Sequence, residues 1–306
     1  MRKLRHPPLG AYGVFGVCAH SVRDLAFRTR LFGALDAVQA AEVAYLALGA
    51  SARLFEFPAS NHIEGWVDGA EMETLYTQTL SRLESPARQY YDALRASAPN
   101  NICPYCGQRT VSTLDHYLPK TIYPVLAVTP INLVPACGDC NKVKLDFQPP
   151  DSEGQILHPY FDDVTSEVWL EARVNDDAGR PVLEFFAAPP TTWLPMLGSR
   201  LETHLRELKL PALYTSHAAE ELINNRESLQ RLRNVGSPDA VRQHCLEEEG
   251  KRRSVHRNNW QAAYYRALAV SDWFCDAGVL AIETSELRWP VDPTAALQAQ
   301  VQADLA

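Results

Sequence analysis

The sequence lacks any long apolar run, any excess of basic charge and any internal repeat. Its longest apolar stretch, from Val43 to Ala52, is far shorter than the roughly 18 uncharged residues of a membrane helix, so we expect no membrane span. The basic residues near Met1 are interrupted by Pro7 and Pro8, and charged residues soon follow, so we expect no signal peptide and a cytoplasmic protein. The absence of a fixed-period repeat or low-complexity tract argues against a solenoid.

The charge balance of the chain is acidic. Among 306 residues, 29 are Lys or Arg and 37 are Asp or Glu, which gives a net charge of −8. Proteins that coat nucleic acid without specificity need many basic side chains to neutralise phosphates, so this class is disfavoured. The ordinary share of hydrophobic and charged residues predicts a globular chain, long enough for two domains or one large one.

Four of the seven cysteines form two C-x-x-C pairs, Cys103 with Cys106 and Cys137 with Cys140. Each pair bends two thiolates toward one point, and two pairs supply the four soft ligands that tetrahedral Zn²⁺ prefers. A redox pair or two disulfides are the alternatives, but a redox motif needs no second copy. The spacing therefore favours a structural zinc site. The three cysteines outside these pairs fit buried, reduced thiols: Cys18, Cys245 and Cys275.

Polar residues of a second kind lie between and beside the cysteine pairs. Asp115 and His116 follow the β-prone run Val111 to Leu114, so their side chains should point to opposite sides of a strand. Asn141 follows Cys140 in what we expect to be the first turn of a helix over residues 139–146. Asp115 and Asn141 offer hard oxygen ligands for Mg²⁺, and a neutral His116 can take a proton from water. This pattern predicts a one-metal phosphodiesterase.

Residues 103–146 resemble the HNH, or ββα-metal, endonuclease family in its zinc-stapled form. The resemblance implies that Asp115 is a metal ligand, His116 the general base, Asn132 the residue that orients the histidine through its loop, and Asn141 the second metal ligand. The final position is Asn where other members have His, a variant that many members use. The resemblance extends weakly to the segment from His158 to Asp162, although His158 itself fits a structural turn better.

Simpler interpretations of these residues stay open. An isolated Asp-His pair is common at surfaces and in cores, Asn132 could be a turn residue after Pro130, and Asn141 could start a helix without any metal. The basic run from Lys251 to Arg257 could contact phosphate, although such runs are more often a solvated helix start or loop.

The flanking sequence predicts helices packed around this module. A capping-box-like Ser21 to Asp24 precedes a helix reaching about residue 48, and further helices are expected around residues 75–83 and 86–96. Residues 168–174 and 182–186 predict a β-hairpin with a turn over 175–179. Later helices are expected at 195–209, 216–233, 238–249 and 257–276, the last with an aromatic stripe that includes Trp260 and Tyr264 and is more often core than a base-stacking surface.

Together these patterns predict a mostly helical α+β protein with a central zinc-bound ββα-metal module and a β-hairpin. The predicted domains are 1–98 (N-terminal helical), 99–150 (nuclease module), 151–190 (hairpin extension) and 191–306 (C-terminal helical). The resemblance implies an Mg²⁺- or Mn²⁺-dependent endonuclease acting on DNA, as an effector of restriction or anti-phage defence. An inactive partner-binding scaffold and an RNA nuclease are the alternatives. Because the chain is acidic, we expect a protein partner or a homo-oligomer to deliver the substrate.

Overall fold

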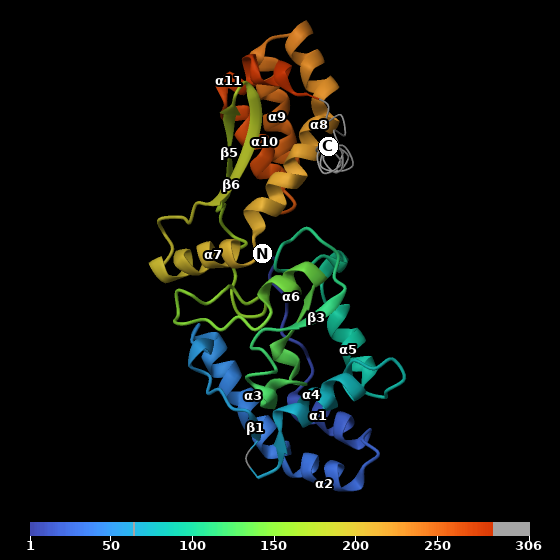
Figure 1. The fold of residues 1–306 in the computed structure, drawn as a ribbon. Coiled ribbons are helices and arrows are strands. Elements are labelled where there is room, and N and C mark those ends of the chain that lie inside the picture. The colour runs from blue at the N-terminus through green and yellow to red at the C-terminus, as the bar shows by residue number, and fades with distance from the viewer. Residues whose placement is uncertain (64, 284–306) are drawn as a thin grey trace, which may run out of the picture.

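The structure is a computed structural model that describes residues 1–63 and 65–283. It is an α+β fold, mostly helical, with three two-stranded antiparallel sheets in the described ranges. In Figure 1 the N-terminal helices occupy one end of the molecule, the strand β3 and helix α6 lie in the middle, and the hairpin β5–β6 with helices α8 to α11 forms the other end.

The N-terminal helices are α1 (Ala11–His20), α2 (Leu25–Gly33), α3 (Leu35–Ala50), α4 (Gly69–Leu75) and α5 (Arg88–Arg95). The prediction of one long helix to about residue 48 was wrong, because the chain breaks at Ala34 between α2 and α3. The Asp24 side chain caps α2 by accepting a hydrogen bond from the Phe27 amide.

The prediction missed α1, which begins after Gly10 without a side-chain cap and therefore carries no start signal in the sequence. The helix expected at 75–83 lies earlier in the chain: α4 ends at Leu75 and continues as a π-helix to Leu80, and Leu83 is exposed.

The central module runs strand, strand, helix. Strand β3 (Thr113–His116) pairs antiparallel with β4 (Leu133–Ala136), and α6 (Gly138–Lys144) follows directly. One apolar cluster packs the N-terminal helices against Leu114 and Leu133 of these strands. A second cluster holds the four paired cysteines and extends into the C-terminal helices. The module is therefore clamped between both ends of the chain.

The C-terminal end consists of β5 (Leu170–Asp177), β6 (Arg180–Ala187) and helices α7 (Pro195–Glu207), α8 (Leu210–Val235), α9 (Pro238–Arg253), α10 (Trp260–Val270) and α11 (Asp272–Asp276). The predicted hairpin is confirmed, although its turn is tighter than expected because Ala178 and Gly179 adopt positive φ angles of 50° and 87°.

The single helix predicted over 257–276 breaks at Ser271, whose hydroxyl caps α11. Helix α8 begins at Leu210, six residues before the predicted start, and α9 runs past the predicted end at 249. The aromatic stripe of α10 is core, as expected: Trp260 is 7% exposed and Tyr264 is fully buried.

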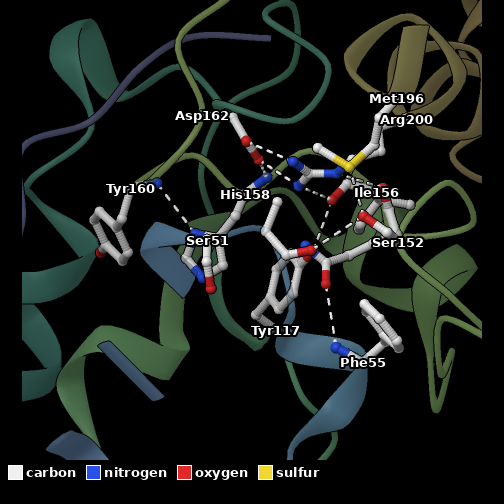
Figure 2. Close-up of polar contacts among 12 residues, drawn as sticks. Ser51, Phe55, Tyr117, Ser152, Ile156, His158, Tyr160, Asp162, Met196 and Arg200 are labelled. Carbon is white, nitrogen blue, oxygen red and sulfur yellow. Dashed lines mark hydrogen bonds and ion pairs between the residues drawn. The ribbon is translucent and has the colours of Figure 1, made fainter. Parts of the chain in front are cut away.

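A buried polar network joins α7 to the segment that follows the module (Figure 2). Arg200 is 1% exposed and donates two hydrogen bonds to the Asp162 carboxylate at 2.7 and 2.6 Å. Its remaining donors reach the carbonyls of Gln155 and Ile156, and the Tyr117 hydroxyl also donates to Ile156 O at 2.6 Å. His158 is buried in the same network, between the Tyr45 hydroxyl and the Tyr160 amide. Because Tyr117 follows His116 directly, this network fixes the end of β3.

No single helix among the described residues has the length and apolar character to cross a membrane. Helices α2 and α3 reach the necessary length and composition only as a pair, which bends by 44° at its break.

Candidate functional site: a four-cysteine cluster beside Asp115 and His116

The four cysteines of the two C-x-x-C pairs converge in the structure. Their sulfur atoms all lie within 4.8 Å of one another, and each residue is at most 3% exposed. Four sulfur ligands at one buried point form a candidate metal site, with the donor set that a tetrahedral Zn²⁺ ion takes. Cys18, Cys245 and Cys275 are buried free thiols elsewhere, as expected.

Backbone amides complete this cluster. The Arg109 amide donates to Cys106 Sγ and the Cys140 amide donates to Cys137 Sγ, both at 3.4 Å. The turn around the first cysteine pair, the first knuckle, closes through Gly107. Gly107 adopts a φ of +65°, which a residue with a side chain would resist. Hydrogen bonds from Cys103 and Cys140 lower the pKa of Cys137, which favours a thiolate there.

The C-terminal helices hold the first knuckle from outside. The Tyr214 hydroxyl of α8 donates to Cys106 O at 2.8 Å, and the His204 ring of α7 contacts Tyr105 O at 3.0 Å. Burial lowers the pKa of His204 to about 3, so this ring is neutral and donates through Nε2. The cysteine cluster is therefore a junction between the module and the C-terminal end.

Asp115 and His116 point to opposite sides of β3, as the sequence predicted. The Asp115 carboxylate faces the cysteine knuckle and α6, where it contacts Tyr105 and Lys144. The His116 ring lies on the other side, against Tyr76 with ring centroids 4.6 Å apart.

The His116 ring is half-buried and anchored at one nitrogen. Its Nε2 atom lies 2.8 Å from the carbonyl oxygen of Ala127. Burial, the largest cause, lowers the pKa of His116 to about 3, so the ring is neutral at physiological pH. Because a carbonyl only accepts, Nε2 carries the proton and Nδ1 keeps a free lone pair. Nδ1 is therefore the acceptor atom of the ring, and the lowered pKa makes it a weak base in this structure.

Asn132 organises the loop that carries the Ala127 carbonyl. It is fully buried; its Oδ1 accepts from the Leu118 amide at 2.8 Å, and its Nδ2 donates to the carbonyls of Leu118 and Leu126 at 3.0 and 3.4 Å. Leu126 precedes Ala127, so the asparagine fixes the segment that orients the His116 ring. This geometry agrees with the role that the resemblance implies for Asn132, although the role itself stays a prediction.

Asp115 forms an ion pair with Lys144, a residue that the sequence pattern did not single out. Lys144, at the last position of α6, places its ammonium 3.3 Å from the carboxylate and 2.6 Å from His116 O. The two side chains are 1% and 3% exposed, which makes a buried ion pair. Tyr105 completes the set by donating to Asp115 Oδ2 at 2.8 Å. Burial raises the pKa of Asp115, and the positive charge of Lys144 opposes that rise.

The donor chemistry of Asp115 and Asn141 suits Mg²⁺, but the observed arrangement does not fit the ion. Asn141 lies in α6 one turn before Lys144 and is half-buried. The ammonium of Lys144 already stands at the Asp115 carboxylate, where a divalent ion would have to bind. An ion on Asp115 therefore requires Lys144 to withdraw.

Two signals in the sequence could have revealed these partners. Lys144 lies three residues after Asn141, so both fall on one face of the predicted helix. Tyr105 lies inside the first cysteine pair, whose position beside Asp115 follows once the four cysteines are assumed to meet. The Ala127 carbonyl carries no side-chain signal.

Comparisons with known proteins add one relative. The chain is 28% identical over 295 residues to protein ea31 of Escherichia phage lambda. The alignment covers 90% of this chain and 99% of ea31. No protein-family model matches the sequence. No solved structure matches it either.

Proposed function

We propose that this chain is an endonuclease of the HNH type that hydrolyses DNA phosphodiester bonds, with Zn²⁺ on Cys103, Cys106, Cys137 and Cys140 as a structural ion. The observation that carries the proposal is the neutral His116 ring, anchored at Nε2 and free at Nδ1. A general base needs a fixed ring and an available lone pair, and it works best with a pKa near the working pH. The proposal therefore requires the pKa of His116 to rise from about 3 when the anionic phosphate binds beside it. The order of β3, β4 and α6 around the cysteine cluster supports the same proposal.

The proposed reaction uses the residues as they stand. Water attacks the phosphorus atom, a new P–O bond forms and the bond to one sugar oxygen breaks. His116 takes the water proton at Nδ1, and the departing oxygen is protonated from solvent. Asn132 keeps the Ala127 carbonyl in place, so the ring does not turn away during the transfer.

The first test is plasmid nicking by the purified protein with Mg²⁺, with Mn²⁺ and with EDTA, beside a parallel RNA substrate. We expect nicking of DNA and its loss in His116→Ala, with the melting temperature and zinc content unchanged. A requirement for Mg²⁺ or Mn²⁺ would mean that Lys144 withdraws from Asp115 in the active state. His62→Ala is the matched control, because His62 is exposed and lies outside the site. Nicking by His116→Ala at the wild-type rate would refute the assignment of His116 as the general base. Cleavage of RNA but not of DNA would show that the substrate is RNA.

A metal-binding scaffold without activity is the second candidate. The buried ion pair of Asp115 with Lys144 favours it, because the pair occupies the carboxylate that a catalytic ion needs. Full zinc occupancy with no cleavage of either nucleic acid would select this candidate. The roles in restriction or anti-phage defence, and a partner or homo-oligomer that delivers the substrate, remain proposals from the resemblance and the acidic charge.

A further inference from the structure

A cavity lies where the cysteine knuckle meets the C-terminal helices. Its volume is about 830 Å³, and it is lined by the N-terminal segment, by Cys106 and Gly107, and by the end of α9 with the loop to α10. The N-terminus in Figure 1 marks this junction, between α6 and α8.

The charge of this cavity departs from that of the chain. Its lining contains Arg2, Lys3, Arg253, His256 and Arg257 but no Asp or Glu, although the chain as a whole carries a net charge of −8. The basic residues come from two walls, the first near Met1 and the second at the end of α9. Burial and then the charge of Arg2 lower the pKa of His256, which places the two walls within electrostatic reach.

Two of these cations lack an ion pair with the described residues, although Cys106 lies near Arg2, and Asp163 and Asp162 lie near Lys3. Within residues 1–63 and 65–283, Arg2 and Arg257 form no ion pair; the Arg2 guanidinium donates one hydrogen bond there, to the Gly107 carbonyl at 3.4 Å. Lys3 donates to the carbonyl of Tyr160 at 2.7 Å. Arg253 is the exception, since its Nε forms an ion pair with the Glu249 carboxylate at 2.8 Å. The basic run was expected to be a solvated helix start or loop, but its first part instead forms the C-terminal turn of α9.

We infer that this cavity binds the phosphodiester backbone of a nucleic-acid strand, a site that rests on the proposed nuclease function and lies outside its hydrolytic residues. Unpaired cations on two facing walls match a chain of phosphates better than a single phosphate group. The nearby aromatic ring of Trp260 is 7% exposed and donates to Gln108, so it offers no stacking face. Binding here should therefore depend on charge and salt and show little dependence on base sequence.

The test is fluorescence anisotropy of a labelled 30-nucleotide DNA, single-stranded and duplex, with zinc-loaded protein and no added Mg²⁺ at several salt concentrations. All proteins carry His116→Ala, so that cleavage does not interfere. The double variant Arg2→Glu/Arg257→Glu should bind at least tenfold more weakly and lower the slope of log K against log salt by about 2. Arg231→Glu is the matched control, because Arg231 is an exposed arginine of α8 outside the cavity. It should retain wild-type binding.

Three outcomes would overturn the inference. They are unchanged binding in the double variant, an equal loss in the Arg231→Glu control, and competition by micromolar ATP, which would make the cavity a mononucleotide site. Failure here leaves the proposed function intact if the wild-type protein still nicks plasmid. Conversely, cavity-dependent binding without any cleavage would uphold this inference and reject the nuclease.

Discussion

Replacing Lys144 tests how Asp115 is stabilised and whether a metal can take the place of the lysine. The two side chains are 1% and 3% exposed, so Lys144→Met leaves a buried carboxylate with Tyr105 as its remaining side-chain partner. Breaking a buried ion pair in this way costs about 3–5 kcal/mol. We therefore expect the melting temperature of the zinc-loaded protein to fall by about 5–8 °C at pH 7.

The same variant has a pH signature. Burial raises the pKa of Asp115 and Lys144 lowers it, so removing the ammonium raises the folded-state pKa further above its unfolded value. A protonated carboxyl needs no counter-ion. The deficit of Lys144→Met should thus be smallest at low pH and grow as pH rises through the folded-state pKa.

Magnesium provides the second arm of this experiment. If Asp115 and Asn141 hold Mg²⁺ once Lys144 is gone, a concentration 100-fold above Kd adds about 2.7 kcal/mol of stability to Lys144→Met, whereas the wild type gains less because its ammonium must first be displaced. Lys142→Met is the control, because Lys142 is an exposed residue of the same helix and should change stability by less than about 0.5 kcal/mol. Equal loss in both variants, or equal stabilisation of wild type and Lys144→Met by Mg²⁺, would refute the competition between lysine and metal.

Two further predictions concern the framework of the site. Protein purified without added zinc should contain one zinc ion per chain by elemental analysis, and Cys137→Ser should lose both the ion and much of its stability, since structural zinc contributes folding energy directly; a folded protein without metal would contradict this. Asn132→Ala should cost roughly 2–4 kcal/mol in chemical denaturation, because it leaves buried polar groups of Leu118 and Leu126 unpaired. Wild-type stability in this variant would show that water replaces the amide.

The local parts of the site follow from the sequence because short-range spacing determines them. Two residues between cysteines fix each knuckle, and the convergence of four sulfurs was predicted from the two pairs alone. The alternation of a strand placed Asp115 and His116 on opposite sides, and the first turn of α6 was expected at Asn141. The hairpin β5–β6 was predicted for the same reason.

The remaining features depend on contacts between residues that are distant in the chain. The pairing of Asp115 with Lys144 depends on how α6 packs against β3, and the network of Arg200 joins residues about 40 positions apart. Arg2 and Arg257 line one basic cavity, while the overall net charge of the chain is negative. Composition averages charge over the whole chain, whereas burial and packing decide which charges meet. The sequence thus determined which chemical groups are present and their local geometry, and the tertiary structure decided which of them are paired and which are free to bind a ligand.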